Sequence, residues 1–181
     1  MKGVVFTEFL QMVEESYSDA LVEELLDSAD LPSGGVYTSV GTYDAAEMTA
    51  LVSRLSELVD VPVPDLLHAF GRWLFDSFLR RYPGFFDGIT STREFLPHVN
   101  EYVHLEVRKL YPDAELPDLS CVVVPDGVEM TYRSARNLPD LAEGLIQGCA
   151  DHYHESVEVS RTPLEGEPPG TLLRVLVSPV A

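Results

Sequence analysis

The hydrophobic residues of this chain change their spacing near Pro112, and this change constrains the fold more than any other feature of the sequence. Before Pro112, apolar residues recur at the spacing of amphipathic helices, whereas beyond it they form short runs typical of strands. Helices gathered in one half and strands in the other are typical of an α+β fold, not of a regular alternation of the two. The sequence therefore predicts helices first and an antiparallel sheet with further helices second.

The helices of the first half are bounded by recognisable capping and breaking residues. Ser18-Asp19 is a start signal for a second helix, and Asp44-Ala45-Ala46-Glu47 has the form of a capping box. The apolar stripes predict helices over residues 5–13, 18–26, 44–59, 65–82 and 92–111.

The second half predicts four strands and one more helix. Residues 121–124 and 128–132 flank Pro125-Asp126-Gly127 and read as a hairpin. Residues 157–159 and 172–177 supply two further strands, and a helix is expected to begin near Pro139. The sum is a four-stranded antiparallel sheet within one domain spanning residues 1–181.

Charge and cysteine content exclude several classes of protein. The net charge of −18 repels nucleic acid and anionic membranes, so neither is expected as a partner. The apolar runs are too short to span a bilayer, and Glu8 interrupts any secretory signal, so a soluble, cytoplasmic protein is expected. Cys121 and Cys149 lack the spacing of a zinc site and are interpreted as buried thiols.

The familiar catalytic motifs are missing from the sequence. His152 and His154 stand two residues apart, which does not place them on one face of a helix. Neither a glycine-rich phosphate loop nor a GxSxG motif is present, and this disfavours a hydrolase or a kinase.

Tyr132, Ser134 and Arg136 occupy every second position directly after the strand-like residues 128–131. If the strand continues through them, all three side chains point to one face of the sheet. Two hydroxyls and a guanidinium on one face would suit a doubly anionic ligand. The alternative is a solvated, polar strand face.

His104 lies at the border of the apolar stripe of residues 92–111, thirteen residues before Pro117. A histidine in such a position is either a hydrogen-bonded structural residue or a ligand. Haem would use both an imidazole in an apolar pocket and donors for its two propionates.

The two motifs together resemble the H-NOX family of haem–nitric oxide/oxygen binding domains. The likeness includes residues 104–112 and 132–136, and it extends from Met1-Lys2-Gly3 to Ala142-Glu143-Gly144-Leu145. It implies that His104 is the axial ligand of haem b, and that Tyr132, Ser134 and Arg136 hold the propionates. It further implies that Pro117 presses on the macrocycle, and that haem lies between a distal helical lobe (about 1–65) and a proximal lobe (about 66–181).

One departure from the family pattern bears on which gas is bound. Oxygen-binding members carry a tyrosine where this chain has Leu141. The other positions expected on the distal side are also apolar: Val5, Phe9, Leu74, Phe78 and Leu145. Bound oxygen benefits from a hydrogen-bond donor far more than NO or CO does, so NO is the expected ligand, CO is possible, and no stable oxygen complex is expected. The cysteine-rich zinc site of some members has no counterpart in residues 162–170.

The resemblance also implies a sensor and not an enzyme. NO binding would break the iron–histidine bond, and the signal would pass to a separate histidine kinase or cyclic-di-GMP enzyme. Two alternatives remain open from the sequence: a peroxidase-like haem enzyme, which would want a distal acid–base residue, and a haem-free interaction module of the same fold.

Overall fold

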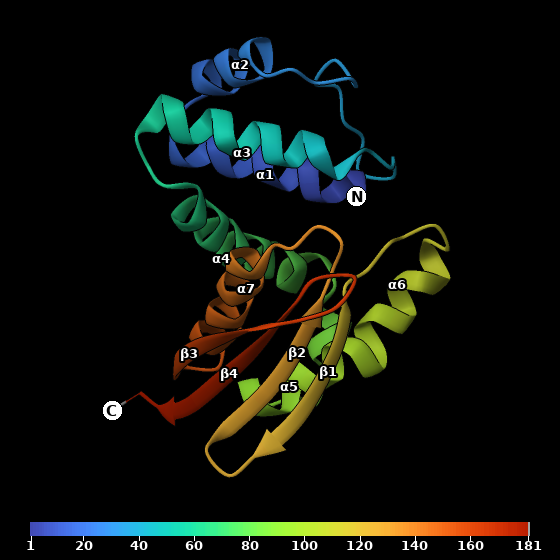
Figure 1. The fold of residues 1–181 in the computed structure, drawn as a ribbon, viewed down its shortest axis with the longest axis vertical. Helices are drawn as coiled ribbons and strands as arrows, with labels where there is room; N and C mark the ends of the chain where they lie inside the picture. Colours follow the sequence, from blue (N-terminus) through green and yellow to red (C-terminus); the bar gives the residue numbers. More distant parts are fainter. Residues whose placement is uncertain (181) are drawn as a thin grey trace.

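The apolar stripes near the N-terminus form helices that pack in one layer. The computed structural model describes residues 1–180, and in it this layer contains α1 (Gly3–Ser16), α2 (Asp19–Ser28) and α3 (Ala45–Val59), at the top of Figure 1. Phe6, Leu25 and Leu51 are fully buried among them. These helices therefore share one apolar core, to which α4 (Val63–Arg81) also contributes.

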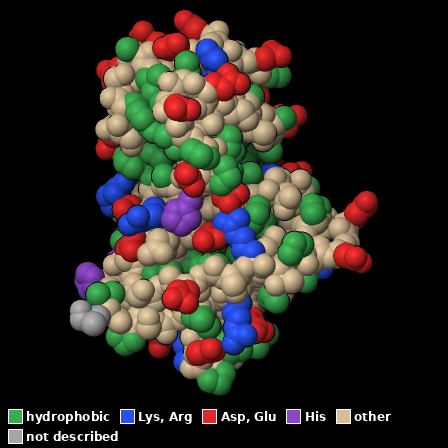
Figure 2. Space-filling view, turned by 60° about the vertical axis from the view of Figure 1, so that its left-hand side comes forward, with side chains coloured by type: hydrophobic (Ala, Val, Ile, Leu, Met, Phe, Trp, Pro, Cys, Tyr) green, Lys and Arg blue, Asp and Glu red, His purple; other side chains and the backbone are tan. Residues whose placement is uncertain are grey.

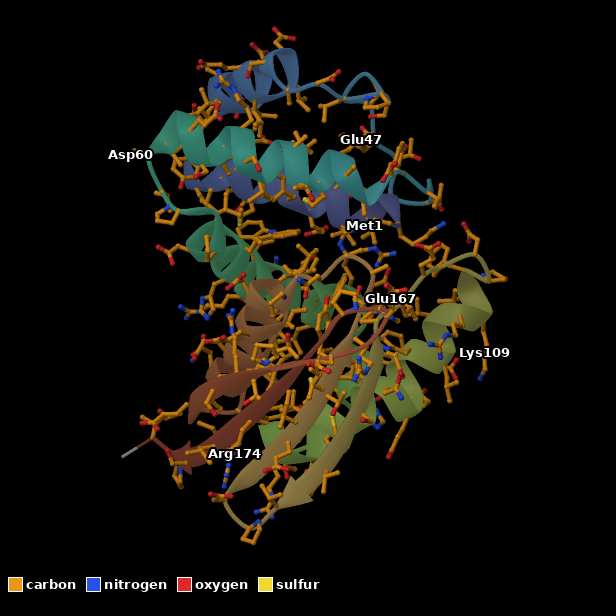
Figure 3. All side chains as sticks on the ribbon, viewed as in Figure 1. Met1, Glu47, Asp60, Lys109, Glu167 and Arg174 are labelled. Atoms are coloured by element: carbon orange, nitrogen blue, oxygen red, sulfur yellow. The ribbon has the colours of Figure 1, made fainter. Side chains whose placement is uncertain are left out.

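The residues expected to cap α2 and α3 do so, but the expected capping box of α3 is not completed. Ser18 Oγ accepts a hydrogen bond from the Leu21 amide at 3.2 Å, and Asp44 Oδ1 accepts one from the Ala46 amide at 2.9 Å. Glu47 was expected to complete a capping box, but its side chain is buried (labelled in Figure 3). It accepts a hydrogen bond from the Tyr37 hydroxyl at 2.8 Å. This carboxylate ties the loop between α2 and α3 to the start of α3.

Two long helices cross in the middle of the molecule. They are α4 (Val63–Arg81) and α7 (Pro139–His152), and their closest approach is at Gly71 and Gly144. A Cβ atom on Gly144 would lie 2.1 Å from the carbonyl oxygen of His68, so only glycine fits there. Because α4 also packs against α1 and α3, it connects the helical layer to the rest of the chain.

The expected helix over residues 92–111 is divided into three segments. They are α5 (Thr92–His98), the π-helical turn η2 (Val99–Val103) and α6 (His104–Leu110), and they follow the short 3₁₀ turn η1 (Pro83–Phe86). The π turn was not predicted. Within it, the amide of His104 donates to the carbonyl of Val99, five residues earlier, which rotates α6 relative to α5.

The sheet is antiparallel throughout, with the strand order β1-β2-β4-β3. Its strands are β1 (Asp118–Val124), β2 (Gly127–Arg133), β3 (Glu155–Leu164) and β4 (Gly170–Pro179), so β3 and β4 are longer than expected. Val128, Leu173 and Val175 are fully buried on the face that α5 and α7 cover. The α+β prediction, including the four-stranded antiparallel sheet, is confirmed.

Acidic side chains outnumber basic ones on the surface, as the net charge of −18 leads one to expect. In Figure 2, acidic side chains gather over the upper part of the molecule, and few basic ones accompany them there. None of the helices in residues 1–180 is both long enough and apolar enough to cross a membrane.

Candidate functional site

A cavity of about 310 Å³ lies between the helical layer, α6 and the sheet. Its walls come from α1, α4, α7, β1, β2 and the segments on both sides of His104, and they are mostly apolar. Both its volume and its lining are typical of a site for an organic ligand or a cofactor.

His104 is the first residue after the π turn, and it lines the cavity. The extra residue in the turn rotates α6 relative to α5, and in this arrangement His104 and Val107 of α6 line the same cavity as Leu96 of α5. The Nδ1 atom of His104 is buried and has no hydrogen-bond partner. Burial, aided by the positive charge of Arg108, lowers the pKa of His104 to about 4. The imidazole is therefore neutral near pH 7, which is the form that binds metals.

Five of the six positions expected on the distal side line the cavity. They are Val5 from α1, Leu74 and Phe78 from α4, and Leu141 and Leu145 from α7. The sixth, Phe9, does not line it: its ring is fully buried and packs edge-on against Phe70, with 5.2 Å between the ring centroids. The Phe9 ring therefore faces α4 within the helical core, next to the wall of the cavity and not in it.

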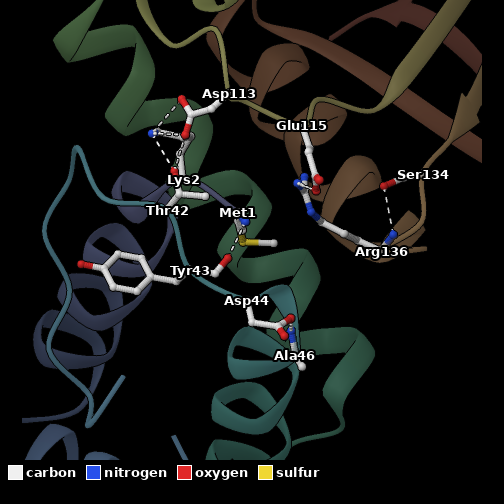
Figure 4. Close-up of polar contacts among 10 residues, drawn as sticks. All are labelled: Met1, Lys2, Thr42, Tyr43, Asp44, Ala46, Asp113, Glu115, Ser134 and Arg136. Carbon is white, nitrogen blue, oxygen red and sulfur yellow. Dashed lines mark hydrogen bonds and ion pairs between the residues drawn. The ribbon is translucent and has the colours of Figure 1, made fainter. Parts of the chain in front are cut away.

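The polar triplet is brought together in a different way from that expected. Strand β2 ends at Arg133, so Tyr132 projects from the strand while Ser134 and Arg136 belong to the turn that follows. Within this turn, Ser134 Oγ accepts a hydrogen bond from the Arg136 amide at 3.2 Å (Figure 4). Tyr132 Oη accepts one from the Leu138 amide at 3.2 Å. Tyr132 from the strand and Ser134 and Arg136 from the turn thus line the same cavity, although the strand does not continue through all three.

Pro117 lines the cavity from the segment between α6 and β1. The same segment carries Glu115, whose Oε2 lies 3.3 Å from Nη2 of Arg136 (Figure 4). Glu115 could not be identified from the sequence, because no motif connects it with Arg136, which lies 21 residues further along the chain. Met1 and Lys2 also line the cavity, and no pattern in the sequence indicates this.

This donor set fits haem. The cavity offers an imidazole nitrogen without a partner, apolar walls and a cluster of one guanidinium and two hydroxyls. Haem iron takes a histidine ligand, its porphyrin is apolar, and its two propionates accept hydrogen bonds.

Comparisons with known proteins agree with this fit. A family model described as Haem-NO-binding matches residues 2–161. The crystal structure of an unliganded Fe(II) H-NOX protein from K. algicida is 32% identical to this chain, with a TM-score of 0.90; the match covers 98% of this chain and 97% of that one. For an H-NOX from Shewanella woodyi, solved with bound IWP-051 in the Fe(II)CO state, the identity is 35%, the TM-score 0.81 and the coverage 99% and 95%.

A third structure, an H-NOX protein from S. oneidensis in the Fe(II)NO ligation state, is 27% identical, with a TM-score of 0.88 and coverage of 98% of this chain and 99% of that one. The family model and these structures each cover most of the chain, and the cavity has the donors that haem needs. This chain therefore belongs to the H-NOX family of haem-binding gas-sensor domains.

Proposed function

We propose that this chain senses nitric oxide through a haem b held in the cavity, with His104 as the axial ligand of its iron. The single observation that carries the proposal is the buried Nδ1 of His104, which lacks a partner in a cavity that also contains Tyr132, Ser134 and Arg136. Haem would supply a ferrous iron able to bind a diatomic gas. The relatives solved with NO and with CO support this choice of ligand.

Tyr132, Ser134 and Arg136 are proposed to hold the propionates. A guanidinium has five N–H donors, so Arg136 can bind a propionate without giving up Glu115. The Arg136 side chain is only 16% exposed, which strengthens a charge-assisted hydrogen bond by limiting competition from water. Pro117 is proposed to press on the macrocycle from the proximal side.

The distal wall is proposed to select against oxygen. Among the residues expected there, Val5, Leu74, Phe78, Leu141 and Leu145 are apolar and line the cavity. None of these side chains has a donor for the partial negative charge of bound oxygen, whereas NO and CO depend much less on such a donor. We therefore expect NO as the physiological ligand, CO as a possible one, and no stable oxygen complex.

Release of His104 is the proposed trigger. Haem held by His104 would supply the site for NO, and loss of the iron–histidine bond would leave His104, and with it the helix α6, free to move. NO regulates only if its affinity differs between the bonded and released arrangements. The proposed output is a shift of a distal lobe (about residues 1–65) relative to a proximal lobe (about 66–181). A separate histidine kinase or cyclic-di-GMP enzyme in the cytoplasm is proposed to respond to this shift.

A histidine replacement tests the ligand assignment. His104→Gly should lose its visible absorption bands when expressed without imidazole and regain them when free imidazole is added. His98→Gly is the matched control, since His98 stacks on Tyr102 and does not line the cavity. Wild-type bands in His104→Gly without imidazole would refute axial ligation by this residue.

A further inference from the structure

A compact polar junction joins the segment after α6 to the start of α1. Lys2 Nζ lies 2.8 Å from Thr42 Oγ1 and 3.3 Å from Asp113 Oδ2, and the Thr42 hydroxyl donates to the same Oδ2 at 2.7 Å (Figure 4). We name Lys2, Thr42 and Asp113 the Lys2 junction. Its three side chains contact one another although Asp113 is far from both of the others in sequence.

The Lys2 side of the junction is firmly held. The Lys2 side chain is only 13% exposed, its Nζ lies 4.9 Å from the centre of the Tyr111 ring, and its backbone forms a β-bridge with Thr42. The next residue, Gly3, is packed so closely that a Cβ atom there would lie 1.8 Å from the Thr38 carbonyl oxygen. The loop around Thr42 is thus attached to the first turn of α1.

Asp113 connects this assembly to the helix that carries His104. It lies in the segment between α6 and β1, shortly after α6 ends at Leu110. The hydrogen bond from Thr42, together with the contact with Lys2, holds the pKa of Asp113 below its ordinary value, so the junction favours its charged form. Tyr111, in the same segment, contacts Lys2 as well.

The other end of the junction leads to the part of the cavity wall that comes from α1. Val4 and Val5 follow Lys2 and Gly3 directly in the first turn of α1, and both line the cavity. The junction is therefore a short covalent and polar connection from the segment after α6 to the part of the cavity wall that α1 supplies.

We infer that the Lys2 junction couples displacement of α6 to the first turn of α1 and to the loop around Thr42. The inference rests on the proposed function in one respect, because the displacement begins with release of His104. When α6 moves, Asp113 and Tyr111 move with it, and Lys2 either follows them or loses its contacts with them. Both events change the environment of residues 36–44.

Hydrogen–deuterium exchange on the haem-loaded full chain, with and without NO, tests this coupling. In the wild type we expect NO to change exchange in α6 and also in residues 36–44. In Asp113→Ala, and in Thr42→Val, which nearly preserves side-chain shape, the change in α6 should persist while the change in residues 36–44 is lost. Glu106→Gln is the matched control, because it removes an exposed ion pair with Lys109, whose side chain Figure 3 labels on the outer side of α6. This variant should behave like the wild type.

The outcomes separate the two proposals. If both junction variants keep the wild-type change in residues 36–44, or if the wild type shows a change in α6 alone, the junction does not couple the two regions. If NO binds but leaves exchange in wild-type α6 unaltered, the proposed release of His104 is refuted, and the coupling falls with it.

Discussion

Leu141 is the residue at which the choice of gas can be tested most sharply. It lines the cavity from α7, opposite the side on which His104 lies in the proposed arrangement, and it has no hydrogen-bond donor. We predict that Leu141→Tyr raises oxygen affinity roughly ten- to a hundredfold, because a hydrogen bond to a charged acceptor contributes about 1.5–3 kcal/mol.

The measurement is the visible spectrum of the reduced, haem-loaded protein after exposure to air. Leu141→Phe is the control, since it adds a ring without the hydroxyl. Equal rates of oxidation in the two variants, with no oxygen complex in either, would contradict the idea that a missing donor excludes oxygen.

Glu8 is an unusual residue, because its carboxylate is buried in the helical core. Its side chain is 1% exposed, Oε1 has no hydrogen bond of good geometry, and the Arg81 guanidinium forms an ion pair with it. Removing one partner of a buried ion pair costs about 3–5 kcal/mol because the other charge is left without compensation. Since the Arg81 side chain is 45% exposed, we expect a smaller loss of about 1–3 kcal/mol for Arg81→Met.

Glu8→Gln should cost less than Arg81→Met, because it removes the buried charge itself and leaves Arg81 with access to water. Urea unfolding midpoints of the single variants and of the double variant measure the difference. A larger loss of stability in Glu8→Gln than in Arg81→Met would show that the buried carboxylate itself is not the costly group.

At the scale of single elements, the π turn η2 determines where His104 lies. Deleting Glu101, an exposed residue of this turn, should convert it to ordinary α-helix. Each residue of an α-helix adds about 100° of rotation, so the deletion turns His104 away from the cavity by about that angle. We predict that the deletion variant retains its helix content by circular dichroism but loses haem.

Glu101→Ala is the control for loss of the side chain alone, and it should bind haem like the wild type. Retention of haem by the deletion variant, with unchanged absorption bands, would show that the turn is not needed to position the imidazole.

The elements differ in how far the sequence could predict them. Hydrophobic spacing was sufficient to predict that the helices near the N-terminus and the four strands exist, because each of these elements buries one face. The π turn could not be predicted, since the apolar residues keep the three- or four-residue spacing of an ordinary helix through it: Leu96, Val99, Val103, Val107 and Leu110. The end of β2 at Arg133 was missed for a related reason: a turn after a strand can keep alternate side chains on one side.

The same limit applies to the lining of the cavity. Val5 and Phe9 are four residues apart and share one face of α1, and spacing alone does not show which of them faces a cavity and which faces another helix. The identity of the motif residues came from resemblance to a family, whereas the pairing of Arg136 with Glu115 required the folded chain.

At the scale of the whole molecule, the charge should make stability depend on salt. With 30 acidic and 12 basic residues, like charges repel one another over the surface. Added salt shortens the range of this repulsion to about 10 Å at 0.1 M. If screening recovers about 1 kcal/mol, the melting temperature rises by about 2–4 °C for a chain of this size.

Thermal unfolding in low and moderate concentrations of NaCl measures this rise, and KCl at the same ionic strength is the control for specific ion binding. A melting temperature that falls with NaCl would show that attractive ion pairs outweigh the repulsion.

The proposed sensor depends above all on the bond between His104 and the haem iron, and on its loss when NO binds. Electron paramagnetic resonance of the reduced, haem-loaded protein after addition of NO reports both, because a nitrogen opposite NO adds its own hyperfine splitting to the spectrum. We predict splitting from the NO nitrogen alone, which means that the His104 imidazole has left the iron. Persistent additional splitting from a histidine nitrogen in the fully NO-bound protein would contradict release as the trigger.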